Sequence, residues 1–148
     1  MNFIKKNITL PLIKNSKMKY LEIDKFASVI NCMDGRTQLP VLEWIIEHYD
    51  IDYPDMITEA GPIKILAENK NKALVEAIKY RLDISVNKHH SKHIFIVAHY
   101  DCAGNPEKKA VQLKQLKKAI KRVKKMNFEV NEIIGLWVNK NWKVKKIE

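Results

Sequence analysis

Asn31-Cys32-Met33-Asp34-Gly35-Arg36 is the first of two short segments that decide how this chain folds. The second segment is His99-Tyr100-Asp101-Cys102-Ala103-Gly104. Each follows an apolar run typical of a buried strand, at residues 26–30 and 94–98, and each precedes a helical pattern. We therefore expect both segments at the carboxyl ends of strands in an α/β sheet, where open parallel sheets bind ligands.

The two segments together carry the side chains of a metal site. Cys32 and Cys102 supply sulfur and His99 supplies an imidazole nitrogen, which are ligands that zinc prefers. Three protein ligands leave a fourth position free, as in catalytic zinc sites. The sequence therefore predicts a zinc site, and a catalytic one.

Length and composition indicate a folded protein of about one domain. The chain has 148 residues, of which 46% are apolar and 30% charged, and this composition excludes a disordered chain. No apolar run approaches the roughly 20 residues that span a membrane, and the first residues lack the pattern of a signal peptide. We expect a cytoplasmic protein with no membrane partner. In that reducing compartment two cysteines are expected to be metal ligands or free thiols rather than a disulfide.

The chain divides into an arm and one domain. Residues 1–25 show no clear period, and we interpret them as an N-terminal arm. Residues 26–148 alternate between strand and helix patterns, which predicts an α/β domain with a parallel sheet covered by helices on both faces. The expected strands lie at 26–31, 55–58, 94–98, 132–138 and 142–147. The last helix is expected to begin at Asn105 and Pro106, because asparagine is a good N-cap and proline a good first helical residue.

The net charge of +10 is concentrated near the C-terminus. Nine basic residues and no acidic residue lie between positions 108 and 125, on a predicted helix. Such a face could follow a phosphate backbone, but no aromatic residue interleaves with the cations and no nucleic-acid motif is present. We interpret this face as solvated surface and do not expect a nucleic-acid partner.

Taken together, the motifs Cys32-x-Asp34-x-Arg36 and His99-x-x-Cys102 resemble the zinc signature of the β-class carbonic anhydrases. The chain is similar to a small, compact subgroup of such proteins with the runs Cys-Met-Asp-Gly-Arg and His-x-Asp-Cys-Ala-Gly-Asn-Pro. The pair Ala60-Gly61 resembles a loop of the family and the segment 135–139 its last core strand. The family usually has Arg-Asn before that Ala-Gly pair, whereas this chain has Thr58 and Glu59.

The resemblance implies a three-layer αβα fold with parallel strands in the order 2-1-3-4 and an added edge strand. It implies a homodimer or larger homo-oligomer, with the active site near the subunit interface. The implied activity is that of a carbonate dehydratase, a lyase with a Zn²⁺ cofactor. The expected small-molecule substrates are CO₂ and bicarbonate, interconverted by hydroxide on the zinc.

Asp34 and Arg36 are the expected catalytic pair. Asp34 is close enough in sequence to Cys32 to ligate the metal as a fourth ligand, or to accept a proton or hydrogen bond from its water. Arg36 can hold the same carboxylate in a bidentate grip. The pair would then work as a latch, open with Asp34 on Arg36 and closed with Asp34 on zinc. The alternative is an ordinary ion pair that caps a turn.

Four further residues are expected to line the substrate pocket, namely Gln38, Gly61, Tyr100 and Gly104. The second ring nitrogen of the histidine ligand needs an acceptor, either a backbone carbonyl or a carboxylate, with Asp101 and Glu59 as candidates.

Several alternatives to a carbonic anhydrase stay open. One is a zinc hydrolase acting on carbonyl sulfide or carbon disulfide, and another is a non-catalytic zinc domain that binds a partner through its basic surface. A third is that both cysteines are simply small buried hydrophobic residues. The histidines 89, 90 and 93 resemble a metal cluster but lie in a lysine-rich loop, and we expect them to be solvated.

Overall fold

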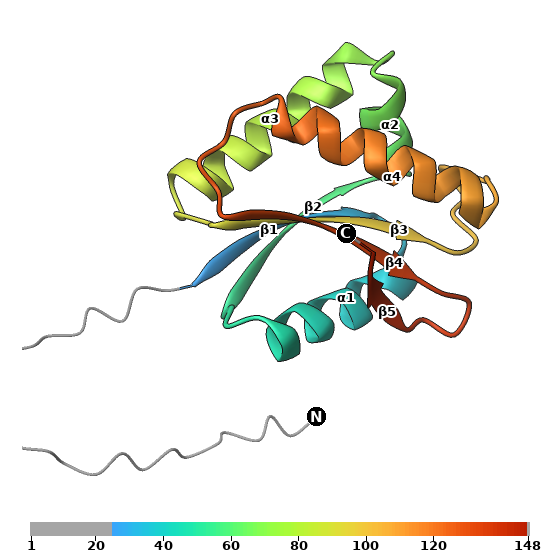
Figure 1. The fold of residues 1–148 in the computed structure, drawn as a ribbon, viewed down its shortest axis with the longest axis horizontal. Coiled ribbons are helices and arrows are strands. Elements are labelled where there is room, and N and C mark those ends of the chain that lie inside the picture. Colours follow the sequence, from blue (N-terminus) through green and yellow to red (C-terminus); the bar gives the residue numbers. More distant parts are fainter. Residues whose placement is uncertain (1–24, 148) are drawn as a thin grey trace, which may run out of the picture.

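The computed structural model describes residues 25–147 as one five-stranded sheet between two layers of helices (Figure 1). The strands are β1 (Phe26–Cys32), β2 (Tyr53–Glu59), β3 (His93–His99), β4 (Glu132–Val138) and β5 (Val144–Lys146). The helices are α1 (Gly35–His48), α2 (Pro62–Glu68), α3 (Lys72–Asn87) and α4 (Lys109–Lys124). Except for Lys25, the predicted N-terminal arm lies outside the described residues.

The strand order is β2-β1-β3-β4-β5, which confirms the predicted order 2-1-3-4 with an added edge strand. The pairs β1–β2, β1–β3 and β3–β4 are parallel, and β5 is antiparallel to β4. Helices α2, α3 and α4 cover one face of the sheet and α1 covers the other (Figure 1). The predicted three-layer αβα architecture is therefore confirmed.

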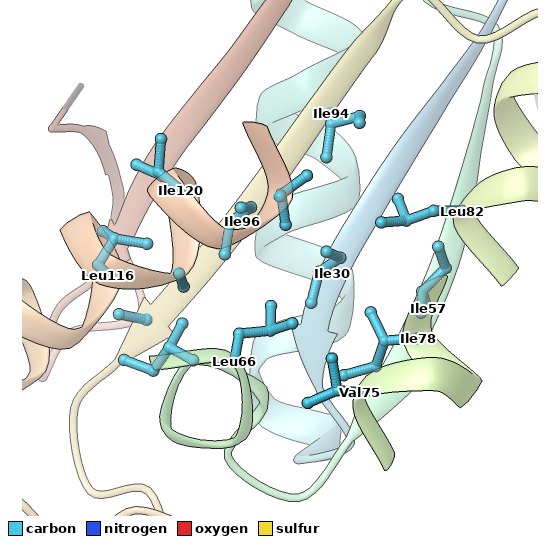
Figure 2. Close-up of a cluster of buried hydrophobic side chains, with 14 of the residues drawn as sticks. Ile30, Ile57, Leu66, Val75, Ile78, Leu82, Ile94, Ile96, Leu116 and Ile120 are labelled. Atoms are coloured by element: carbon cyan, nitrogen blue, oxygen red, sulfur yellow. The ribbon is translucent and has the colours of Figure 1, made fainter. Parts of the chain in front are cut away.

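The central strands are buried on both faces, which explains why their sequences are almost continuously apolar. Successive side chains of β1 point to opposite sides, so Ile30 packs under α2, α3 and α4 (Figure 2) whereas Val29 packs under α1. Phe95 and Ile96 divide in the same way on β3. This double core fixes the relative positions of the strands and thus of their tips.

Three elements differ clearly from the prediction, and one of them is β5, which covers Val144–Lys146 rather than 142–147 because Trp142 lies in the preceding turn. Strand β2 runs over Tyr53–Glu59 rather than 55–58, because it is an edge strand whose polar residues mask its pattern. Helix α4 begins at Lys109 and not at Asn105. Asn105 is fully buried in the preceding loop, where its backbone N–H donates to the Cys102 carbonyl at 3.1 Å. Packing of this loop overrides the local helix-start signal.

No helix among residues 25–147 is long and apolar enough to cross a membrane.

Candidate metal centre

The tips of β1 and β3 bring two thiols and one imidazole together. Ser28 to Ile30 of β1 pair in parallel with Ile94 to Ile96 of β3, so the carboxyl ends of both strands lie side by side at the same end of the sheet. Cys32 is the last residue of β1, His99 is the last of β3, and Cys102 lies in the loop that follows. One ligand atom from each of these three residues lies within 4.8 Å of the others.

All three side chains are buried. Cys32 is 3% exposed, His99 1% and Cys102 4%. The two sulfur atoms are 3.8 Å apart, and both cysteines are free. Within residues 25–147 this is the only group of histidine, cysteine and acidic side chains close enough to share a metal ion.

The ring of His99 is oriented with one nitrogen available. Its Nδ1 lies 2.8 Å from the carbonyl oxygen of Tyr100, and because a carbonyl can only accept, Nδ1 donates. In the neutral ring the lone pair is therefore on Nε2, which is buried and has no hydrogen-bond partner. An unpartnered buried nitrogen of this kind is expected of a metal ligand. The orienting acceptor is thus a backbone carbonyl, and neither of the carboxylates considered from the sequence, since Asp101 pairs with Arg36 and Glu59 with Arg81.

The two thiols have unequal acidity. A hydrogen bond from Cys102 holds the pKa of Cys32 well below its usual range against the effect of burial, and the backbone amides of Gly61 and Asp34 act in the same direction. The same hydrogen bond raises the pKa of Cys102. Burial lowers the pKa of His99, but the Cys32 sulfur and the Tyr100 carbonyl outweigh it and raise the pKa overall.

This donor set fits zinc. Two thiolates neutralise a dication, so the cost of burying the ion is reduced. Two sulfurs and one nitrogen are ligands that zinc accepts, and each is held by its own backbone contacts. Cys32, His99 and Cys102 could therefore form a metal site.

Asp34 and Arg36 form a bidentate ion pair beside the three candidate ligands. Arg36 Nη2 donates to Asp34 Oδ2 at 2.7 Å and Arg36 Nε to Oδ1 at 3.0 Å. This pairing lowers the pKa of Asp34 to about 2. Asp34 Oδ1 also accepts the backbone N–H of Arg36 at 3.0 Å and caps α1. The carboxylate thus lies on arginine, as in the open arrangement of the predicted latch, and it also caps the helix, as in the alternative interpretation.

Gly61 and Gly104 lie beside the two cysteine sulfurs, where their loops touch. They belong to the loops after β2 and β3, which meet so closely that a Cβ on Gly61 would lie 2.7 Å from the Gly104 carbonyl carbon. Gly61 also has a left-handed backbone, with φ of +62°. The Gly61 amide acts on the Cys32 sulfur and the Gly104 amide on the Cys102 sulfur, in each case lowering the pKa of the thiol.

The other two expected pocket residues, Gln38 and Tyr100, have different surroundings. Gln38 Nε2 donates to the Cys32 carbonyl at 2.5 Å, which ties α1 to the tip of β1. Tyr100 is half exposed and borders a hollow of about 490 Å³. Cys102 and Trp137 also line that hollow, which therefore leads from the surface to one of the candidate ligands.

Sequence reasoning missed Gln112. Its side chain is 1% exposed. The Nε2 of Gln112 donates to the His99 carbonyl at 2.9 Å and to the Glu107 carbonyl at 3.2 Å, and so joins α4 to the end of β3 and to the loop that follows it. One signal was present, because Gln112 lies four residues before Leu116 on the buried stripe of α4, where an apolar residue is expected. Within the part of the chain that the structure describes, the histidines 89, 90 and 93 do not form a group that could hold a metal ion. His89 Nδ1 instead lies 2.8 Å from the Asp55 carboxylate.

Comparison with known proteins agrees with this centre. No curated protein matches the chain. A family model with the description "Putative carbonic anhydrase" matches residues 22–148, which include every helix and strand of the described residues and all the candidate metal ligands. The chain therefore belongs to this family of carbonic anhydrase-like proteins.

Proposed function

We propose that the protein is a zinc-dependent carbonic anhydrase that interconverts CO₂ and bicarbonate. The observation that carries the proposal is the convergence of two buried sulfurs and one unpartnered imidazole nitrogen within 4.8 Å, at the tips of adjacent parallel strands. Membership of the family supports the reaction.

Three residues would hold the ion, namely Cys32, His99 and Cys102. A bound zinc ion would supply Lewis acidity, which lowers the pKa of water and makes it a nucleophile near neutral pH. The backbone carbonyl of Tyr100 fixes the His99 tautomer, and the amides of the two glycine loops stabilise negative sulfur. Of the three ligands, only Cys32 has a net lowered pKa, so a bound ion would have to displace the proton from Cys102.

Asp34 would act on the reacting water as a hydrogen-bond acceptor. Because the pKa of Asp34 is about 2, the carboxylate stays charged at neutral pH and does not store a proton. It lies near enough to His99 for its charge to help raise the pKa of that imidazole, after the larger effect of Cys32. Arg36 fixes the direction of the carboxylate through two parallel hydrogen bonds. The hollow beside Tyr100 and Cys102 is the proposed substrate entrance.

Stopped-flow measurement of CO₂ hydration by the zinc-loaded protein, across pH, tests the proposal. We expect activity that requires one zinc per chain and falls steeply in Asp34→Ala, while Asp83→Ala, a change on the exposed face of α3, stays active. Cys102→Ser should contain little zinc by metal analysis. A zinc-loaded protein without hydration activity at any pH would contradict the anhydrase, and the same samples assayed with carbonyl sulfide and carbon disulfide would show whether the alternative hydrolase applies.

A further inference from the structure

We infer that Asp101 and Trp142 are positioning residues that hold Arg36 in place and thereby keep Asp34 off the fourth position of the metal site. The inference rests on the proposed function, because the latch matters only if the three ligands hold a metal. It adds two residues to the Asp34–Arg36 pair, and they come from two other parts of the chain.

The edge of the Arg36 guanidinium is filled by two aspartates. Asp34 accepts from Nε and Nη2, at 3.0 and 2.7 Å. Asp101 accepts from the other terminal nitrogen, with its Oδ2 3.1 Å from Nη1, and its backbone carbonyl oxygen lies 3.1 Å from Nη2. A guanidinium has five N–H donors in a rigid fork, so the two aspartates use different hydrogens and do not compete.

The flat face of the same guanidinium lies against Trp142. The Arg36 Cζ atom is 4.5 Å from the centroid of the indole ring, within the range of a cation–π contact. The Arg36 side chain is 47% exposed, and an exposed arginine with a single ion pair keeps much of its rotamer freedom. Contacts from Asp34, Asp101 and Trp142 together remove that freedom.

Both holding residues have a left-handed backbone, which is strained for the tryptophan. Asp101 has φ of +56° and Trp142 has φ of +58°, the left-handed region that favours glycine. Aspartate tolerates this region, but tryptophan is a true outlier there, and such strain is retained mainly where it serves a site. Two of the five non-glycine residues with this backbone among residues 25–147 therefore touch one arginine.

The turn between β4 and β5 is built to present the indole. The backbone N–H of Trp142 donates to the backbone carbonyl of Asn139 at 2.9 Å. The Asn139 side-chain oxygen accepts the N–H groups of Asn141 at 2.9 Å and Lys143 at 3.0 Å. The indole also packs on the apolar cluster beneath α1, so its position is set by the core as well as by the turn.

These contacts bias the latch toward its open state. If Asp34 moves to the metal, the Nε and Nη2 donors of Arg36 lose their acceptor. Arg36 could replace these hydrogen bonds by turning into water, but its contacts with Asp101 and Trp142 oppose that movement. Without the indole, Arg36 is free to turn outward, and the carboxylate is free to close the metal site.

Cobalt-substituted full-length protein provides the test, with thiocyanate as the probe. Cobalt(II) in a sulfur and nitrogen site has visible bands that report its fourth ligand. In the parent we expect thiocyanate to change these bands, because the fourth position is open. In Trp142→Leu the apparent affinity for thiocyanate should fall by about tenfold, as expected when about nine-tenths of the molecules are closed. Trp142→Phe keeps an aromatic face and should behave like the parent.

The double variant Trp142→Leu with Asp34→Asn isolates the cause. We expect it to regain the thiocyanate response, because no carboxylate remains to close the site. Asp101→Asn, which leaves the backbone carbonyl contact in place, should weaken thiocyanate binding in the same direction as Trp142→Leu and keeps the test valid if the leucine variant does not fold.

Three results would overturn the inference. If Trp142→Leu and Asp101→Asn bind thiocyanate with the affinity of the parent, the positioning role is wrong, and the proposed anhydrase activity is unaffected. A double variant that stays unresponsive would show that the loss came from a damaged site and not from Asp34. A parent protein that binds no cobalt would remove the metal centre itself, and the proposed function with it.

Discussion

His99 is the residue whose surroundings say most about the centre. Its Nδ1 hydrogen bond to the Tyr100 carbonyl leaves a lone pair on Nε2, which has no hydrogen-bond partner among the described residues and lies near the Cys32 sulfur that raises the pKa of the ring. A buried histidine without a ligand role would be expected to use both nitrogens in hydrogen bonds. The hydrogen bond between the two neighbouring sulfurs lowers the pKa of Cys32 and raises the pKa of Cys102, and a metal ion would displace the proton that this bond holds.

Asp34 contributes to stability as well as to the site. Its pKa of about 2 is below the value of about 3.9 for a free aspartate. A depressed pKa stabilises the folded state above the unfolded value, and this contribution is lost as the pH falls from about 4 to about 2. We expect Asp34→Asn, which keeps a good N-cap, to reduce the free energy of unfolding by about 1 kcal/mol at pH 7.

Urea unfolding at several pH values measures this effect. The difference between parent and Asp34→Asn should shrink as the pH falls through that window, because the parent carboxylate then takes up a proton. Asp83→Asn, on the exposed face of α3, should change the free energy of unfolding by less than about 0.5 kcal/mol at every pH. A difference that does not depend on pH would show that the cap and not the charge is responsible.

At the scale of elements, the centre depends on two loops in direct backbone contact. A Cβ on Gly104 would lie 2.6 Å from the carbonyl carbon of Ala60 and 2.7 Å from the nitrogen of Gly61. We expect Gly104→Ala to force the loops after β2 and β3 apart, to reduce the free energy of unfolding by about 1–3 kcal/mol, and to weaken zinc binding.

A second glycine of the motif is the control for this variant. A Cβ on Gly35 would meet nothing within 4 Å, so Gly35→Ala should fold and bind zinc like the parent. Urea unfolding and competition with a chromophoric zinc chelator compare the two alanine variants. Equal stability and equal zinc affinity would contradict the role of the loop contact.

The sequence predicts strands and helices better than individual side-chain contacts. The buried strands can be read from it because β1 and β3 are apolar on both faces, and with the motifs at their ends the ligand cluster follows. The helix start at Asn105 could not be predicted correctly, since its local signal is that of an N-cap while its burial depends on loops distant in sequence. Trp142 lies about a hundred residues from Arg36, and nothing in the residues around it indicates that contact.

At the scale of the whole molecule, three large apolar side chains in α1 and the turn before it face solvent. Met33 is 65% exposed, Leu39 59% and Ile46 46%. Leu39 and Ile46 are two helical turns apart, so they share one face of α1. If the chain forms the expected homodimer, we predict that these apolar side chains lie at the contact with the second copy.

Sedimentation of the purified protein tests this prediction. The parent should sediment as a dimer or larger oligomer at micromolar concentration. Leu39→Lys should shift it toward monomer, while Tyr80→Lys, an equally exposed position on α3, should not. A parent that is monomeric at all concentrations, or a Leu39→Lys variant with unchanged sedimentation, would contradict the prediction.

The parallel order of the sheet has a consequence for how the protein matures. Cys32 ends the first strand, whereas His99 and Cys102 become available only after two helical crossovers have been synthesised and packed. A nascent chain that stops short of β3 offers a cation only one of the three ligands. We therefore expect any metal ion at this centre to bind after the sheet has assembled, and not to nucleate folding of the chain.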